Sequence, residues 1–249
     1  MLIETSFTMK KVLLLCSALT ALSAQAQFQN EIKVVQQQRG AENYLGRSAA
    51  ADKNMVVAGA PESRLFEFAP LNPLEPGQVE FFAITLTGYQ PLTYTPPSDL
   101  GPDDLFGLDV ALAGQYAAVA SPKHALDANQ QNPLNWPGAV YVYNFNGTHW
   151  NISQKLVCPD RDELDQFGHS VAMDGDLLVV GAPGEDLDNN NQNNINYAGA
   201  VYVYRRGSNG QYALEAKLSA IDRAALDAFG WDVDVDGNYI IAGSPWNDL

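Results

Sequence analysis

Phe167-Gly168-His169-Ser170-Val171-Ala172 opens a segment that ends on Leu178-Val179-Val180-Gly181-Ala182-Pro183. The proline follows the leading glycine by fifteen residues, and this spacing recurs four times along the chain. The leading glycines are Gly46, Gly107, Gly168 and Gly230, and the prolines are Pro61, Pro122, Pro183 and Pro245. The period is 61, 61 and 62 residues, and a constant period of this kind indicates a repeat architecture.

The remainder of each unit also repeats. Sixteen residues after each of the first three prolines, a glycine opens an alternating strand such as Gly199-Ala200-Val201-Tyr202-Val203-Tyr204. An aromatic residue then begins another strand, such as Trp150 to Leu156. Asn146-Gly147 lies between these strands and suits a tight hairpin turn, because both residues accept positive φ angles. Together with two shorter apolar runs, at Val171–Met173 and Leu177–Val180, the pattern predicts four strands per unit.

The second of these strands decides the fold class. Leu177-Leu178-Val179-Val180 is apolar at every position, which a strand requires only when both faces of its sheet are covered. Four-stranded sheets packed face to face around an axis meet this requirement. The sequence therefore predicts an all-β protein, a β-propeller of four-stranded antiparallel blades. We expect the blades at about residues 44–95, 106–156, 167–218 and, incomplete, 229–249.

The two ends of the chain are out of phase with the repeat. Residues 28–35 are in register with the fourth strand of a unit, so we expect them to close a blade formed by the far end of the chain. The fourth unit stops after its second strand, which leaves about three and a half blades. Because propellers have more blades than this, we interpret the sequence as an N-terminal fragment of a longer protein. A self-assembling partial ring is the alternative.

The first 26 residues have the pattern of a secretory signal peptide. Met9-Lys10-Lys11 is a basic n-region, Val12 to Leu22 is an apolar core, and Ala24-Gln25-Ala26 is a small-residue cleavage site. Translation starts at Met1 or at Met9. No segment is long and apolar enough for membrane insertion, so the sequence predicts a secreted, periplasmic or cell-surface protein.

The acidic composition restricts the class of partner. The formal charge of −15 becomes −16 without residues 1–26, and a charge of this sign repels phosphate backbones, which argues against nucleic acid. Cys158 is then the one remaining cysteine, so no internal disulfide can form, and we expect a packed thiol there. The sequence contains no nucleophile elbow, phosphate-binding glycine loop or Cys/His metal spacing.

The opening motif resembles the FG-GAP repeat, which is the unit of the integrin α-chain propeller and of many secreted bacterial proteins. The resemblance extends over residues 28–249. It implies a seven-bladed propeller whose N-terminal strand closes the last blade. It also implies extracellular recognition or adhesion rather than catalysis, and a place for calcium in the turn between strands one and two.

One of these turns has the composition of a calcium loop. Asp232, Asp234 and Asp236 precede Gly237 in the spacing Asp-x-Asp-x-Asp-Gly, and Ca²⁺ prefers carboxylate oxygens. Against this candidate, the fifteen-residue spacing leaves no room for an inserted loop, and Gly243 stands where a closing acid is needed. The other interpretation, which we prefer, is a strand with acidic side chains facing the axis or the solvent.

The loop of residues 184–198 is a second cation candidate, because it holds Glu185, Asp186, Asp188, Asn189, Asn190 and Asn191. We prefer the interpretation of a solvated connection tolerant of left-handed conformations. The corresponding loops hold Phe66, Phe68 and Trp136, which either form a binding surface or cover the blade edges.

Acids recur at two positions of the unit. One stands two residues before each Phe-Gly or Tyr (Glu42, Asp104, Asp165, Asp227), and a second stands five residues earlier in three units (Asp99, Asp160, Asp222). A catalytic acid would not be copied in every repeat. We therefore expect these acids to accept N–H groups of turns.

Three hypotheses about function follow. The first is a non-catalytic propeller that binds an extracellular protein or glycan through its loops. The second is the propeller scaffold of a larger extracellular enzyme, whose active site lies in missing blades or in an appended domain. The third is a spacer in a surface protein. Convergent acids and histidines would favour the second, but His124, His149 and His169 stand at different positions of different repeats.

Overall fold

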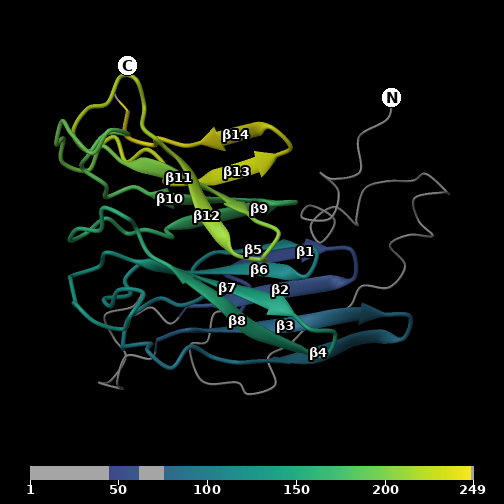
Figure 1. Cartoon of the computed structure of the whole chain (residues 1–249). Helices are drawn as coiled ribbons and strands as arrows, with labels where there is room; N and C mark the ends of the chain where they lie inside the picture. Colours follow the sequence, from purple (N-terminus) through teal and green to yellow (C-terminus); the bar gives the residue numbers. More distant parts are fainter. Residues whose placement is uncertain (1–44, 62–75, 248–249) are drawn as a thin grey trace, which may run out of the picture.

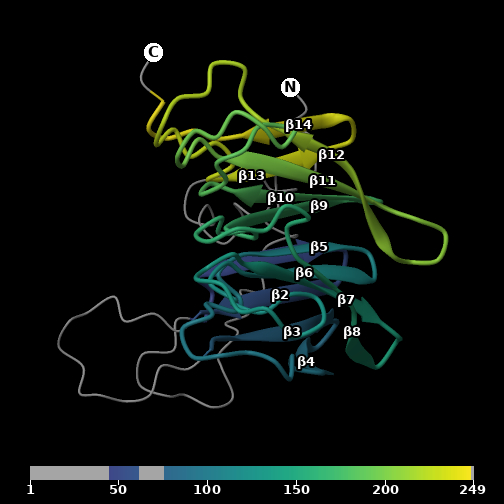
Figure 2. The same cartoon turned by 60° about the vertical axis from the view of Figure 1, so that its left-hand side comes forward.

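The computed structural model describes residues 45–61 and 76–247, and these hold fourteen strands and no helix. The predicted signal peptide and closing strand (residues 28–35) lie outside the described residues, as do Glu42, Phe66 and Phe68. Within the described ranges, no helix is long and apolar enough to cross a membrane. Figures 1 and 2 show the third unit of the repeat above the first two, and the hairpin of the fourth unit above the third.

The strands follow the repeat. The first unit contains β1 (Ser48–Asp52), β2 (Met55–Ala60), β3 (Gln78–Thr85) and β4 (Gly88–Tyr94). The second contains β5 (Val110–Ala113), β6 (Tyr116–Ser121), β7 (Ala139–Phe145) and β8 (His149–Leu156). The third contains β9 (Ser170–Asp174), β10 (Leu177–Ala182), β11 (Ala200–Arg206) and β12 (Tyr212–Leu218). The fourth contains β13 (Val233–Asp236) and β14 (Tyr239–Ala242).

Within each unit, every strand pairs antiparallel with the next, as expected for a propeller blade. The third unit is a separate four-stranded sheet, and β13 and β14 form a two-stranded sheet. The sequence did not predict the joining of the first two units into one eight-stranded sheet. There β4 and β8 pair in parallel over two residue pairs, Thr93 with His149 and Tyr94 with Trp150.

The turns between strands one and two are two-residue turns with a left-handed first residue. Lys53, Gly114, Gly175 and Gly237 have φ angles of 53°, 60°, 56° and 58°. Because glycine adopts this conformation without a steric penalty, it occupies the position in three of the four turns. Strand two stops shortly before the proline of each unit, since proline has no N–H to donate to the ladder.

The core lies between the units as well as within them. One buried cluster includes Val140 and Val142 of the second unit and Phe167, Leu178 and Tyr202, which begin or belong to the third. A second cluster joins the first two units, and a third joins β10 and β11 to β13. The apolar second strand is thus covered on both faces, as its sequence predicts. This face-to-face packing of four-stranded units is that of a partial β-propeller.

The repeated glycines allow adjacent units to approach closely. Gly138, which opens strand three, forms a parallel bridge with Phe167 of the next unit, and an added Cβ would lie 2.2 Å from the Phe167 carbonyl oxygen. Gly77 with Phe106 and Gly199 with Phe229 repeat this bridge. The Phe-Gly motif of one unit is therefore held against the preceding unit by backbone contact, which only a residue without a side chain permits.

Candidate functional site

The acid before each Phe-Gly accepts an N–H group of its own turn. The Asp104 Oδ2 accepts from the Gly101 N–H at 2.7 Å, the Asp165 Oδ2 from Asp162 at 2.6 Å, and the Asp227 Oδ2 from Ala224 at 2.7 Å. All three aspartates are buried. These contacts confirm the structural role predicted for this position in the units that the structure describes.

In the second blade, the earlier acid belongs to a buried polar network, which we call the second-blade clasp (Asp99, Asp104, His124, Tyr141 and Lys155). Lys155 Nζ donates to Asp99 Oδ2 at 2.6 Å, and Tyr141 donates to Asp99 Oδ1 at 2.8 Å. Lys155 Nζ also lies 2.8 Å from His124 Nε2, and His124 Nδ1 lies 2.6 Å from Asp104 Oδ2. The network links the segment before β5 to β7, β8 and the loop after β6.

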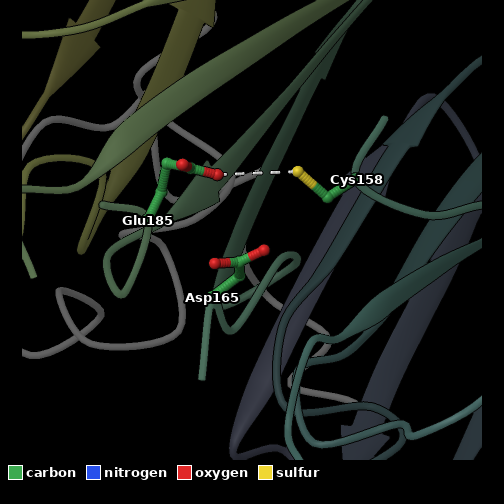
Figure 3. A group of neighbouring side chains, drawn as sticks. All are labelled: Cys158, Asp165 and Glu185. Atoms are coloured by element: carbon green, nitrogen blue, oxygen red, sulfur yellow. Dashed lines mark hydrogen bonds between the residues drawn. The ribbon is translucent and has the colours of Figure 1, made fainter. Parts of the chain in front are cut away.

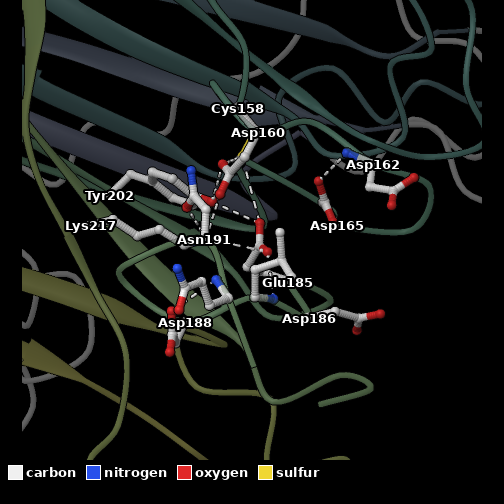
Figure 4. A network of polar contacts seen from close by, with 12 residues as sticks. Cys158, Asp160, Asp162, Asp165, Glu185, Asp186, Asp188, Asn191, Tyr202 and Lys217 are labelled. Carbon is white, nitrogen blue, oxygen red and sulfur yellow. Dashed lines mark hydrogen bonds and ion pairs between the residues drawn. The ribbon is translucent and has the colours of Figure 1, made fainter. Parts of the chain in front are cut away.

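The third blade repeats this arrangement in the third-blade clasp (Cys158, Asp160, Asp165, Glu185, Tyr202 and Lys217), shown in Figure 4. Lys217 Nζ donates to Asp160 Oδ2 at 2.5 Å and lies 3.3 Å from Glu185 Oε1. Tyr202 Oη lies 2.7 Å from Glu185 Oε2 and 2.8 Å from Asp160 Oδ1. Cys158 Sγ lies 2.9 Å from both Asp160 Oδ1 and Tyr202 Oη. Each acid of this clasp thus has at least one hydrogen-bond donor.

Burial and mutual charge shift the pKa values in the third-blade clasp. Burial, together with the charge of Glu185, raises the pKa of Asp165 to about 8. Burial alone would also raise the pKa of Asp160, but hydrogen bonds from Cys158, Lys217 and Tyr202 outweigh it and leave that pKa lowered. Burial and the nearby Asp160 raise the pKa of the Cys158 thiol well above its usual value. Cys158 is therefore a packed thiol rather than a thiolate nucleophile, as its sequence context suggested.

Two loops leave the blades beside these clasps, and we call residues 123–137 and 184–198 the rim loops. Both are built on one frame. The Asp127 Oδ1 accepts from the backbone N–H groups of Asn129 and Gln131 at 2.8 and 3.0 Å, and its Oδ2 accepts from the Asn132 side chain at 2.7 Å. In the second rim loop, Asp188 makes the same three bonds at 2.8, 3.0 and 2.6 Å, to Asn190, Gln192 and Asn193.

Each rim loop is also fixed by an arginine of the segment that follows its blade. Arg161 donates to the carbonyl oxygens of Asn132 and Ala125. Arg223 donates to those of Asn193 at 3.1 Å and Asp186 at 2.7 Å. Side chains at the loop tips, over residues 128–133 and 189–194, remain exposed. The loops are therefore rigid at their base and open at their tips, at one end of the strands (Figure 2).

The common frame has a sequence signal that we did not recognise from the sequence alone. Leu126-Asp127-Ala128-Asn129-Gln130-Gln131-Asn132 and Leu187-Asp188-Asn189-Asn190-Asn191-Gln192-Asn193 share the pattern Leu-Asp-x-Asn-x-Gln-Asn. The overall compositions of the loops differ and conceal it. The preferred interpretation of residues 184–198 as a connection with left-handed residues agrees with the φ angles of Asn191, Asn193 and Tyr197, which are 56°, 49° and 55°.

Comparison with known proteins agrees with this geometry. A sequence model described as the FG-GAP repeat matches residues 150–204 and 212–249. Integrin alpha-7 of Mus musculus and of Rattus norvegicus are each 32% identical to this chain over 114 residues, which are 41% of the chain and 9% of the integrin. Integrin alpha-7 of Homo sapiens is 32% identical over 113 residues, 8% of its length.

The chain contains FG-GAP repeats and is similar in part to integrin α chains. The match spans only about a tenth of the length of these integrins. Because the repeat is a propeller unit, the FG-GAP match agrees with the all-β, partly complete propeller observed in the described residues.

The described residues include one buried group with the composition of a metal centre. In the described part of the chain, Cys158, Asp165 and Glu185 are the one set of three His, Cys, Asp or Glu residues whose ligand atoms lie within 4.8 Å of one another (Figure 3). The ammonium group of Lys217 already lies beside Glu185, and Cys158 retains its proton. A cation at this place would meet a positive charge and a neutral thiol, so the set is better suited to its internal hydrogen bonds than to a metal.

The calcium candidates lie elsewhere, on the last hairpin. Asp232, Asp234 and Asp236 are exposed and alternate along the strand with the buried Val233 and Val235. Asp234 and Asp236 lie on one face of β13, and Asp232 directly precedes that strand, so the three acids do not surround a loop. Calcium binding by these residues remains a prediction.

Two of these acids occupy positions at which acids in the earlier units of this chain make hydrogen bonds to the next blade. The counterpart of Asp236 in the third blade is Asp174, whose Oδ2 accepts from the Gly237 N–H at 2.7 Å. The counterpart of Asp232 in the second blade is Asp109, whose Oδ2 accepts from the Val171 N–H at 2.8 Å. In the second and third blades, the acids at these two positions therefore accept hydrogen bonds from the backbone of the next blade.

The three histidines occupy separate environments. His124 lies in the second-blade clasp, and His149 contacts Thr93 and Thr95 at the junction of β4 and β8. His169 lies against Trp231, with ring centroids 4.2 Å apart and the rings tilted by 45°. The exposed Trp136 stands beneath Lys123, whose Nζ is 4.3 Å from its ring centroid. The structure thus brings only His124 into a clasp.

Proposed function

We propose that this chain is a non-catalytic, secreted or cell-surface module that binds an extracellular protein or glycan through its rim loops. The observation that carries the proposal is the common frame of the two loops. On successive blades, Asp127 and Asp188 hold the same backbone conformation and present exposed amide side chains. A surface held rigid before binding loses little conformational entropy when a partner binds, and amides both donate and accept hydrogen bonds.

The FG-GAP identity supports this proposal, because it points to an adhesion-type domain. The acidic charge of the chain favours a neutral or basic partner. The number of blades in the complete ring, cleavage near Ala26 and the absence of catalytic activity are parts of the same proposal. The alternative of a scaffold for a larger enzyme gains no specific observation from residues 45–61 and 76–247.

Binding of the chain without residues 1–26 to a printed glycan array and to a panel of purified extracellular-matrix proteins tests the proposal. In one variant Asn129 and Gln130 are replaced by alanine, and in another Asn189 and Asn190. The matched control is Ser208→Ala, an exposed residue of the β11–β12 hairpin at the opposite end of the strands (Figure 2). We expect at least one ligand, a loss of its binding of about tenfold in a loop variant, and no change in the control. Binding that both loop variants retain in full would refute the role of the rim loops.

A further inference from the structure

One position of the unit, seventeen residues after the leading glycine, holds a different residue in each of three blades: His124, Glu185 and Asn247. This position faces the buried acid that precedes the Phe-Gly. His124 Nδ1 lies 2.6 Å from Asp104 Oδ2, and Asn247 Nδ2 lies 3.3 Å from Asp227 Oδ2. In both of these blades the facing residue can donate a hydrogen to the acid.

The protonation of His124 follows from its neighbours. Lys155 Nζ, which can only donate, lies 2.8 Å from His124 Nε2, so Nε2 accepts and the ring hydrogen is on Nδ1. The Nδ1–H then donates to Asp104. A single ammonium group, that of Lys155, accompanies the two carboxylates Asp99 and Asp104 in the second-blade clasp.

The third-blade clasp lacks this donor. Glu185 replaces the histidine and brings a further carboxylate, so that the ammonium group of Lys217 accompanies three acids: Asp160, Asp165 and Glu185. Asp165 and Glu185 are each 2% exposed, and their nearest carboxylate oxygens lie within 4.8 Å. Two carboxylates this close in a buried place do not both ionise readily at neutral pH, because the mutual repulsion is poorly screened.

We propose that Asp165 and Glu185 hold one proton between them at neutral pH, so that the pair carries a single negative charge, as Asp104 with His124 and Asp227 with Asn247 do. The third-blade clasp is then sensitive to alkaline pH. With one proton bound, it has the same net charge as the second-blade clasp. The raised pKa of Asp165 agrees with this assignment. The clasp joins the segment after β8 to β11, β12 and the second rim loop, so release of the proton weakens the attachment of this segment to the third blade.

The other titratable or charged groups around the pair act in both directions. Lys217 of β12 and Arg161 of the segment before β9 favour ionisation of the pair, whereas the remaining acids oppose it. The groups that interact with the pair are Cys158, Asp160, Arg161 and Asp162 from the segment after β8, Tyr197 from the rim loop, Tyr202 from β11, and Lys217 from β12.

The sign of the pH dependence follows from linkage. The folded protein binds this proton more tightly than the unfolded chain, in which an aspartate has a pKa of about 3.9. Stability is therefore highest below that value, falls as the pH rises toward about 8, and is constant above it. This contribution has the opposite sign to that of an ion-paired aspartate.

The test is the melting temperature between pH 5 and pH 9 of the full chain and of Asp165→Asn and Glu185→Gln. Each substitution removes one acid and makes the shared proton unnecessary. The melting temperature of each variant should therefore fall less between pH 5 and pH 9 than that of the unsubstituted chain, by about 5 °C or more. Asp227→Asn is the matched control, because Asp227 is equally buried and accepts the same turn N–H but faces Asn247. Its curve should run parallel to that of the unsubstituted chain.

A direct measurement covers the case in which a variant does not fold. The ¹³C chemical shifts of the Asp and Glu carboxyl carbons of the unsubstituted chain should show one buried group that titrates well above pH 6. Glu185→His, which rebuilds the second-blade arrangement, should abolish that titration while the protein stays folded. Parallel melting curves for all variants, or titration of every carboxyl group below pH 5, would overturn the proposal.

Discussion

A methyl group on Gly181 would lie 2.0 Å from the carbonyl oxygen of Gly230 in the next blade. Gly181 belongs to the Gly-Ala-Pro of the third unit, and Gly230 to the Phe-Gly of the fourth. The first two blades repeat the contact, because a methyl group on Gly59 would lie 2.0 Å from the carbonyl oxygen of Gly107. The two halves of the motif thus meet across the junction of two blades as well as within one blade, where the Gly168 N–H donates to the Gly181 carbonyl oxygen at 2.9 Å.

Replacement of Gly181 by alanine should destabilise the protein by about 1–3 kcal/mol, because the fourth blade must move away to accept the methyl group. The second blade has Ala120 at this position, so we expect a spacing adjustment rather than loss of the fold. Urea unfolding measures the change. Gly175→Asn is the control, because Gly175 has open space around it and asparagine tolerates its φ angle of 56°. Equal stabilities of the two variants would contradict the prediction.

Replacement of Asp99 by asparagine should cost about 3 kcal/mol at pH 7, because it leaves the buried ammonium group of Lys155 without its carboxylate. Burial would raise the pKa of Asp99, but the hydrogen bonds from Lys155 and Tyr141 outweigh it and leave the pKa lowered. Asp99 therefore contributes stability above the pKa of about 3.9 of an unfolded aspartate, and this stability is lost as the pH falls through the folded value.

Urea unfolding from pH 7 down to pH 3 checks this, since the difference between Asp99→Asn and the unsubstituted chain should shrink as the pH falls. Asp222→Asn is the matched control. Asp222 stands at the same position of the fourth unit but is exposed, and we expect a change below about 0.5 kcal/mol. A difference that stays constant over this pH range would show that the ion pair does not cause it.

Replacement of Asp188 by alanine should loosen the second rim loop while the blades stay intact. The substitution removes the acceptor of two backbone N–H groups and of the Asn193 amide. Hydrogen exchange over residues 187–193 should accelerate by about tenfold, because local opening no longer breaks these bonds. The first rim loop, which Asp127 holds, serves as the internal reference. Acceleration of both loops together would indicate general destabilisation instead.

Calcium binding at Asp232, Asp234 and Asp236 predicts a melting temperature that rises when calcium is added and falls when a chelator removes it. Asp234→Asn should abolish the rise, because Asp234 is exposed between the other two acids and its one hydrogen bond is to the N–H of the adjacent Val235. Magnesium at the same concentration controls for ionic strength. A melting temperature that does not respond to calcium would retire this site.

The sequence by itself determined the units and their strands. The fifteen-residue spacing, the alternating strands and the apolar second strand are local patterns, and residues close in sequence carry their whole signal. The role of Asp104, Asp165 and Asp227 was also predictable, since each accepts an N–H only three residues away. The rim-loop frame was detectable in principle from Leu-Asp-x-Asn-x-Gln-Asn, but only after the two loops were aligned.

Only the tertiary structure decided which groups meet across the blades. Lys155 is 56 residues from Asp99 in sequence, and Lys217 is 57 from Asp160, so no local pattern pairs them. The pairing of β4 with β8 and the contact of Gly181 with Gly230 likewise depend on how the sheets stack. The physical reason is that strands form from local propensity and hydrophobic pattern, whereas the charge that surrounds Glu185 is set by packing. A histidine, an asparagine and a glutamate at one position of the repeat therefore lead to different protonation only once the fold has placed a buried acid beside each of them.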